Sequence, residues 1–292
     1  MNRTLSILFG TGAGILWALS SICAQYLYSH ADVSTDWAVP VRMIGAGLFL
    51  LVYLAVFRRD ELNEILHSRR DLMRAAVSGL AGTMMMQYTF FLTIQQAGAA
   101  AATVLQYVSP VILLVYSCLE MHRKPEGREI LAVCLSVCGV FLLCFGGMNG
   151  VRIPLKAVLC GLSSAGFMAA ASVIPARLYR KYSVSTVMCV AFLCGGTVLY
   201  IVLGSRNLTP SLSPDTFAAF MGVILIGSVF GYLSYGRSIR LGNAKKTSLY
   251  SSVEPAAAAF FAWLFLHDTV TFGMTAGLCL VLAAVVLTAL TE

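Results

Sequence analysis

Long apolar runs follow one another along the whole chain, and they constrain this sequence more than any other feature. A helix needs roughly 20 mostly apolar residues to cross a bilayer. Ten runs approach or exceed that length, at residues 5–28, 37–57, 73–95, 98–119, 130–147, 155–178, 184–204, 215–236, 244–266 and 272–290. Membrane β-strands, which alternate apolar and polar residues, would not give such runs. The sequence therefore predicts an all-α polytopic membrane protein with ten transmembrane helices.

The composition agrees with that class. Hydrophobic residues make up 59% of the chain and charged residues only 11%, whereas soluble domains have roughly 25% charged residues. The first run is long enough to span, so we interpret it as a membrane helix rather than a signal peptide. The nine cysteines fall in apolar runs without zinc spacing, which is typical of small buried hydrophobes and predicts no metal site.

The net charge of +7 reflects topology rather than nucleic-acid binding, because the basic residues are scattered between the apolar runs. One set of alternate connections is rich in them, while the opposite set holds only Arg152, Lys156 and Arg206. The positive-inside rule then places both termini in the cytoplasm. The residues on the rich side are Arg3, Arg58, Arg59, Arg69, Arg70, Arg74, Arg123, Lys124, Arg128, Arg177, Arg180, Lys181, Arg237, Arg240, Lys245 and Lys246.

The chain also contains an internal repeat. The segment YTFFLTIQQAGAAAATVLQYVSPVILLVYSCLEMH begins at Tyr88, and YLSYGRSIRLGNAKKTSLYSSVEPAAAAFFAWLFLH begins at Tyr232. They align Gly98 with Gly242 and, after a shift of one residue, Pro110 with Pro255. Two repeats of five spans, 1–147 and 148–292, would insert in opposite orientations because five is odd. Inverted repeats around a central cavity are typical of secondary transporters.

Together with this layout, three segments resemble one known family. They are VRMIGAGLFLL in the second run, TVLQYVSPVILLVY in the fourth and LYSSVEPAAAAFFAWLFLHDTVT in the ninth. The chain resembles the EamA-type transporters of the drug/metabolite transporter superfamily over essentially its whole length. The resemblance implies a cell (inner) membrane protein with ten helices around a cavity lined mainly by helices 1, 3, 4, 6, 8 and 9. It also implies alternating access. Similar members export amino acids and related metabolites, others carry drugs or nucleobases, and some run inward.

Two ionisable residues lie within the spans, where such residues are functional candidates by default. At 1.5 Å per residue, Glu254 lies roughly 15 Å inside the ninth span and Arg42 roughly 8 Å inside the second. Glu254 could bind substrate, carry a proton, or pair with Arg42 as an ion pair or gate. Arg42 could also contact substrate, serve a structural role, or extend to the outer surface.

Pro110 and Pro255 interrupt the fourth and ninth spans at corresponding places. A proline inside a helix leaves the carbonyl four residues earlier without its donor, here those of Gln106 and Ser251. Such carbonyls at membrane depth need other partners or must line a wet cavity. The two prolines are therefore predicted hinges beside a binding site, although simple kinks for helix packing are the alternative.

Aromatic and amide side chains gather in the spans that the resemblance assigns to the cavity. Any one of them could serve packing alone, but as a set they predict a cavity with aromatic walls and polar tips. The expected substrate-binding residues are Trp17, Gln25, Gln87, Tyr88, Phe91, Gln106, Tyr107, Tyr232, Tyr235, Ser251 and Glu254.

Three function classes follow. The first is a secondary transporter that exports a small metabolite, above all an amino acid, with possible proton coupling. The second is a multidrug or organic-cation exporter, which an acidic cavity without a basic partner would favour. An uptake carrier is a variant of either. The third, a membrane enzyme, finds no support, because the four histidines lie at span ends or in loops and no catalytic motif occurs. No cofactor is expected. The expected partners are a small-molecule substrate and the lipid bilayer, and the oligomeric state stays open, with a monomer among the possibilities.

Overall fold

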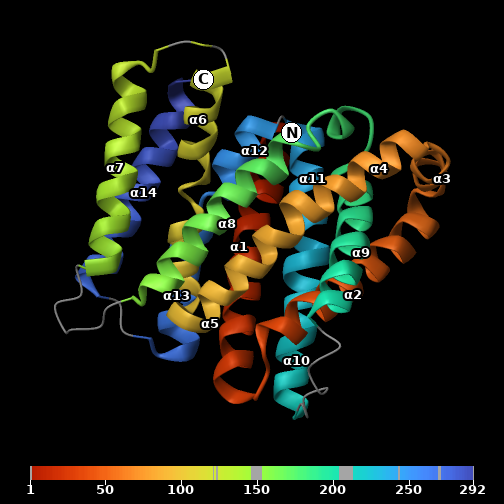
Figure 1. The fold of residues 1–292 in the computed structure, drawn as a ribbon, viewed down its shortest axis with the longest axis horizontal. Helices are drawn as coiled ribbons and strands as arrows, with labels where there is room; N and C mark the ends of the chain where they lie inside the picture. Colours follow the sequence, from red (N-terminus) through yellow and green to blue (C-terminus); the bar gives the residue numbers. More distant parts are fainter. Residues whose placement is uncertain are drawn as a thin grey trace.

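The computed structural model describes residues 2–120, 122, 124–145, 153–203, 213–242, 244–268 and 271–291. These residues form helices and connections without a strand (Figure 1). Within them, seven helical segments are long and apolar enough to cross a membrane: Arg3–His30, Thr35–Phe57, Arg69–Glu120, Leu155–Val173, Val184–Val202, Pro214–Leu241 and Lys246–Leu266. The chain is therefore an all-helical, multi-pass membrane protein.

The elements up to residue 145 are α1 (Asn2–His30), α2 (Thr35–Phe57), α3 (Arg59–His67), α4 (Arg69–Ser78), η1 (Gly79–Met84), α5 (Met85–Gln106), α6 (Ser109–Glu120) and α7 (Gly127–Phe145). Those that follow are α8 (Leu155–Val173), η2 (Leu178–Arg180), α9 (Val184–Val202), α10 (Pro214–Gly222), η4 (Val223–Gly231), α11 (Tyr232–Leu241), α12 (Ala244–Ser251), α13 (Glu254–Leu266) and α14 (Phe272–Thr291).

The segment Arg69–Glu120 has 52 residues but is not one straight helix. At Gly98 the backbone has φ 82° and ψ 167°, a conformation that glycine adopts without steric cost. The chain turns back there, between the third and fourth predicted spans (Figure 1). The break expected between the runs 73–95 and 98–119 is therefore present, while the total of ten membrane helices stays a prediction.

Local features of the first half recur in the second. The π-helical segments η1 and η4 begin equally far before Gly98 and Gly242, at Gly79 and Val223. Beyond the prolines, His122 and His267 both have left-handed backbones, with φ 50° and 53°. These recurrences agree with the sequence repeat, and the inverted relation of the halves stays a prediction.

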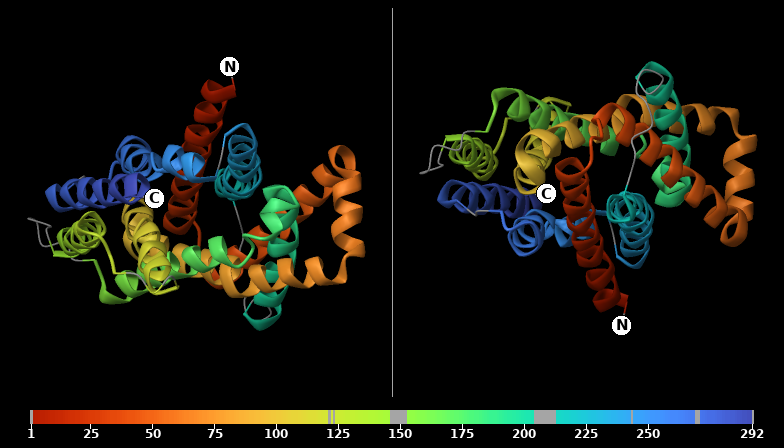
Figure 2. Two further views of the ribbon diagram at one scale, coloured as in Figure 1. Left: turned by 90° about the horizontal axis from the view of Figure 1, so that it is seen from above. Right: turned by 90° about the horizontal axis from the view of Figure 1, so that it is seen from below.

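Helices of the two halves pack against each other in pairs. α2 lies against α9, α5 against α8, α7 against α14, and α1 against η4 and α11. Figure 2 shows α7 and α14 together at one edge of the molecule and α3 at the opposite edge. Small residues permit close approach: a Cβ added to Gly79 would lie 2.6 Å from the Cα atom of Ala191.

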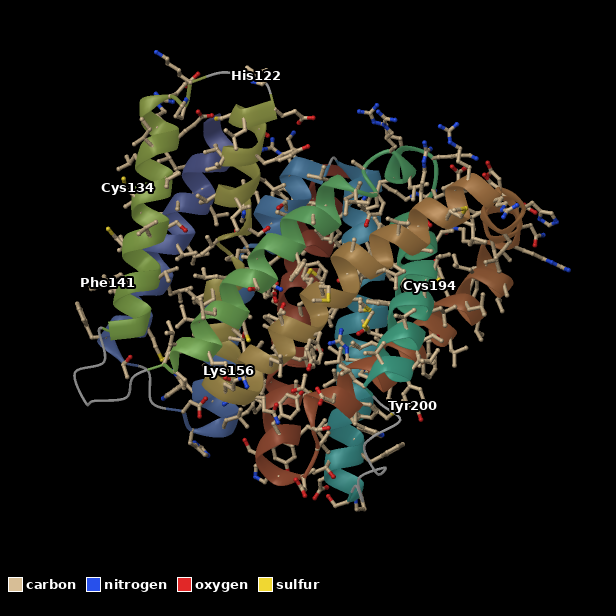
Figure 3. All side chains as sticks on the ribbon, in the orientation of Figure 1. His122, Cys134, Phe141, Lys156, Cys194 and Tyr200 are labelled. Carbon is tan, nitrogen blue, oxygen red and sulfur yellow. The ribbon has the colours of Figure 1, made fainter. Side chains whose placement is uncertain are left out.

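The beginning of α1 and the end of α14 lie at the same end of the molecule (Figure 1). His122 lies at that end as well, whereas Lys156 and Tyr200 lie at the other (Figure 3). This arrangement agrees with the alternation of connections in the sequence. Which end faces the cytoplasm stays a prediction from the charges.

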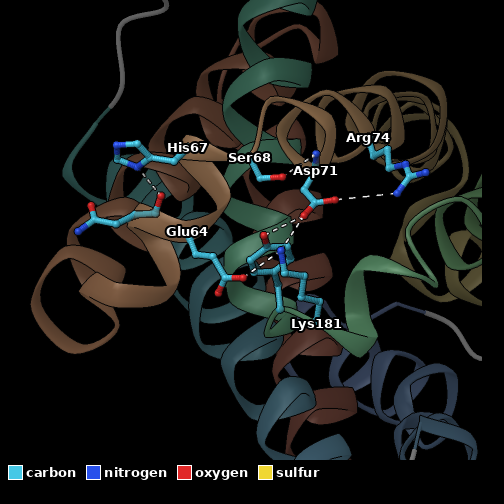
Figure 4. A network of polar contacts seen from close by, with 8 residues as sticks. Glu64, His67, Ser68, Asp71, Arg74 and Lys181 are labelled. Atoms are coloured by element: carbon cyan, nitrogen blue, oxygen red, sulfur yellow. Dashed lines mark hydrogen bonds and ion pairs between the residues drawn. The ribbon is translucent and has the colours of Figure 1, made fainter.

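A polar network joins α3 and α4 to the chain before α9 (Figure 4). Lys181 Nζ lies 2.9 Å from both Glu64 Oε1 and Asp71 Oδ2. The Glu61 carboxylate accepts hydrogen bonds from the Ser183 backbone N–H and, at 2.8 Å, from the Thr186 hydroxyl. Burial raises the pKa of Glu61, but these hydrogen bonds outweigh it and hold the pKa below its ordinary value. The network ties a connection of the first half to the second half.

Candidate functional site

A cavity of about 260 Å³ lies among helices of both halves. Its wall includes nine of the eleven expected substrate-binding residues, together with Arg42 and Pro110. The nine are Trp17, Gln87, Phe91, Gln106, Tyr107, Tyr232, Tyr235, Ser251 and Glu254.

The ninth predicted span is interrupted inside this cavity. α12 ends at Ser251 and α13 begins at Glu254, which places Pro255 in the first turn of a new helix. A proline is tolerated there because the N–H it lacks would have no partner within the helix. The carboxylate of Glu254 lies in the same turn, where the helix dipole favours negative charge. Pro255 therefore starts a helix rather than bending a continuous one.

Tyr107, from the other half, bridges this interruption. Its hydroxyl lies 2.8 Å from the carbonyl oxygen of Ser251 and 3.2 Å from Glu254 Oε2. The Ser251 carbonyl, four residues before Pro255, is the one that the sequence predicted to lack a helical donor. All three residues are buried. The carbonyl expected to lose its donor at membrane depth thus has a side-chain donor from the opposite half.

Tyr107 is itself part of the corresponding interruption. α5 ends at Gln106, α6 begins at Ser109, and Pro110 falls in the first turn of α6. The Gln106 amide, beside the break, donates to the Ser164 hydroxyl at 2.7 Å. Both predicted hinges therefore coincide with breaks between helices.

Arg42 lies in the interior of α2 with only 4% of its surface exposed. Its guanidinium carbon is 4.2 Å from the centre of the Phe91 ring, and its Nε donates to the Ser228 hydroxyl at 3.3 Å. The ion pair with Glu254, one of the alternatives left open by the sequence, does not form in this structure: among the described residues, no salt bridge joins the two. The π face of Phe91 stabilises the cation instead.

Aromatic rings form one wall of the cavity. The Trp17 ring centre lies 5.4 Å from that of Tyr232 and 5.3 Å from that of Tyr235. Trp17 Nε1 donates to the Gly227 carbonyl at 3.1 Å, within the π-helical segment η4. Gln87 reaches the Tyr232 hydroxyl at 3.4 Å. This wall agrees with the aromatic cavity expected from the sequence.

Two expected residues, Gln25 and Tyr88, do not line the cavity. The Gln25 side-chain amide donates to Asp268 Oδ2 at 2.6 Å, and its oxygen accepts from the Ala99 N–H at 2.7 Å. Gln25 therefore stabilises the turn at Gly98. The Tyr88 hydroxyl donates to Asp36 Oδ1 at 2.7 Å. Both side chains are held by partners near helix ends, which the spacing within a span could not indicate.

The sequence interpretation missed other polar residues of the cavity, among them Ser21, Thr83, Ser172 and Tyr179. Ser21 stands four residues after Trp17, so helical spacing could have found it. Tyr179 lies in a basic connection that indicated only topology. Within the described residues, no group of three or more histidine, cysteine or acidic side chains could hold a metal ion.

Known proteins resemble the chain over nearly all of its length. The EamA-like transporter family matches residues 4–145 and again residues 155–290. The uncharacterized inner membrane transporter YicL of Salmonella typhimurium is 29% identical over 95% of this chain and 93% of its own. The threonine/homoserine exporter RhtA of the same species is 22% identical over 92% of this chain and 88% of its own. A solved crystal structure shares the fold, with a TM-score of 0.66 at 14% identity, covering 99% of this chain and 98% of its own. The chain therefore belongs to the EamA-like transporter family.

Proposed function

We propose that the protein is a secondary transporter that exports an amino acid or a related zwitterionic metabolite by alternating access. One observation carries the proposal: a buried cation, Arg42, and a buried carboxylate, Glu254, line one cavity without pairing with each other. Charges at membrane depth are costly unless they find partners. The carboxylate and ammonium groups of an amino acid would supply a partner for each.

The size of the cavity supports a small substrate. Pockets for drug-sized ligands have volumes of roughly 300–1,000 Å³, and this cavity, at about 260 Å³, is smaller. Arg42 also argues against an organic-cation exporter, because a cation in the wall would repel a cationic substrate. RhtA is a threonine/homoserine exporter, which agrees with the amino-acid class.

The contacts of Tyr107 in the cavity support a proposed route for proton coupling. The Tyr107 hydroxyl carries one proton but has two acceptors within reach, Glu254 Oε2 and the Ser251 carbonyl. When Glu254 is ionised, the hydroxyl donates to the carboxylate. When Glu254 is protonated, its own O–H donates to the phenol oxygen, and the phenol turns to Ser251. The charge on Glu254 would thereby control the contact that bridges the broken helix.

Alternating access would use the breaks at Pro110 and Pro255 as hinges between the two inverted halves. In this arrangement ten helices cross the inner membrane with both termini in the cytoplasm. The basic connections at the end of the molecule that holds the termini support that orientation. Transport by the fold itself requires neither a cofactor nor a catalytic step.

Transport by purified protein in liposomes tests the substrate class. We expect labelled amino acids to cross and quaternary amines not to cross. Arg42→Gln should lower amino-acid transport by roughly 10- to 150-fold, because a hydrogen bond to a charged group contributes about 1.5–3 kcal/mol. Arg237→Gln is the matched control, since its guanidinium lies over Phe9, outside the cavity. Passage of the quaternary amines alone would overturn the proposal in favour of the cation exporter.

Direction and coupling need separate measurements. Cells preloaded with the amino acid should lose it faster when they express the protein, whereas faster net uptake would identify an uptake carrier. Glu254→Gln should abolish the response of transport to an imposed pH gradient. An unchanged response would exclude Glu254 as the proton carrier and leave it a substrate ligand only.

A further inference from the structure

A second hollow, here called the arginine groove, lies on the surface between α4 and the chain that follows α8. It has a volume of about 510 Å³. Its wall combines three arginines with four apolar side chains: Arg70, Arg74 and Arg177, with Met73, Val77, Ile174 and Leu178. The arginine groove is separate from the central cavity and shares no lining residue with it.

Helical spacing aligns the two walls of the arginine groove. On α4, Arg70, Met73, Arg74 and Val77 stand three or four residues apart and therefore share one face. On the opposite wall, Ile174, Arg177 and Leu178 repeat the spacing within the turns that follow α8. Each wall thus places cationic groups beside apolar side chains.

The arginines of the groove have few acidic partners. Within the described residues, neither Arg70 nor Arg177 forms a salt bridge, and Arg74 reaches only Asp71, at 3.9 Å (Figure 4). An excess of positive charge therefore faces the arginine groove. A ligand with a phosphate would complement it, because guanidinium groups bind phosphate oxygens with paired hydrogen bonds.

The apolar wall faces outward. Met73 is 58% exposed, Val77 53% and Ile174 41%. Arg70 stands in the first turn of the candidate span that begins at Arg69, and Arg177 stands just beyond the candidate span that ends at Val173. At the end of a span, exposed apolar side chains would contact lipid chains, and the neighbouring arginines would reach the headgroups.

We propose that the arginine groove binds an anionic phospholipid, with the headgroup phosphate on the arginines and an acyl chain along Met73, Val77 and Ile174. Basic pockets between membrane helices are a known way to hold such headgroups. The lipid would contact both halves of the chain, because α4 belongs to the first half and residues 174–178 to the second. The site does not depend on which substrate the central cavity carries.

Native mass spectrometry of the purified protein tests the proposal, with dioleoyl phosphatidylglycerol or dioleoyl phosphatidylcholine added at equal concentration. The variant Arg70→Gln/Arg74→Gln/Arg177→Gln should lose about 100-fold in affinity for phosphatidylglycerol, since each basic residue near an anionic lipid contributes about 1 kcal/mol. Its affinity for phosphatidylcholine should not change.

The control variant Arg69→Gln/Arg128→Gln/Arg180→Gln removes the same charge from outside the arginine groove. It should lose less than about fivefold in phosphatidylglycerol affinity. An equal loss in both variants would overturn the proposal, because binding would then follow net charge alone. Displacement of the lipid by inorganic phosphate at the same concentration would also overturn it and indicate a site for soluble anions. If the triple variant does not fold, Arg177→Gln alone should still lower the affinity severalfold, and an unchanged affinity would refute the site.

Discussion

Replacement of Tyr107 by phenylalanine removes one hydroxyl and keeps the ring. The free-energy cost follows from the burial of its partners, because Ser251 is 4% exposed and Glu254 is 5% exposed. While Glu254 is ionised, the single O–H can donate to only one of the two acceptors at a time, so the variant then loses one hydrogen bond rather than two. A buried acceptor left without a donor costs about 1–3 kcal/mol. The Tyr107→Phe variant should therefore have a free energy of unfolding about 1–3 kcal/mol lower, because the break between α12 and α13 loses its hydrogen bond from Tyr107.

Thermal unfolding in detergent and transport in liposomes measure this effect together. Tyr235→Phe is the matched control: Tyr235 lines the same cavity, but its hydroxyl donates to no described residue. We expect Tyr107→Phe to unfold at a lower temperature and to lose the dependence of transport on pH. The free energy of unfolding of Tyr235→Phe should stay within about 0.5 kcal/mol of that of the natural protein. Equal behaviour of the two variants would refute the assignment of the Tyr107 hydroxyl as the bridge across the break.

Two further predictions concern the packing of the halves. Gly79→Ala should lower the free energy of unfolding by about 1–3 kcal/mol through overpacking, because the new Cβ would lie 2.6 Å from the backbone of Ala191. The control is Gly12→Ala, whose Cβ meets nothing within 4 Å. The thermal midpoint of Gly79→Ala should fall below that of the control. Glu61→Ala should lower the free energy of unfolding by about 0.5–2 kcal/mol, because the Ser183 N–H at the start of α9 loses its acceptor. The pKa of Glu61 is lower in the folded state than its ordinary value of 4.5. The contribution of Glu61 to the free energy of unfolding is therefore complete above pH 4.5 and is lost as pH falls through the folded-state pKa. A thermal midpoint that fell equally at pH 7 and at pH 3 in the Glu61→Ala variant would contradict this account.

The sequence predicted much of the cavity wall because burial in a membrane restricts where polar groups can lie. Trp17, Glu254 and Tyr107 were identifiable as polar-tipped or charged residues inside apolar runs, where each needs a reason to be present. The prolines located the helix breaks for a similarly local reason. Gln25 and Tyr88 carried the same signal, yet they serve contacts near helix ends. The type of residue indicated that each needs a partner but could not indicate which partner it meets.

The membrane class, the approximate ends of most helices and membership of the family follow from the order of residues alone, because hydrophobic length and local spacing are properties of the chain itself. Three features depended on the tertiary structure. They are the hydrogen bond from Tyr107 to the break between α12 and α13, the position of the Arg42 guanidinium over the Phe91 ring, and the arginine groove between the two halves of the chain. Each joins groups that lie far apart in sequence. Such contacts arise only when the helices pack, since packing alone determines which faces of distant segments meet.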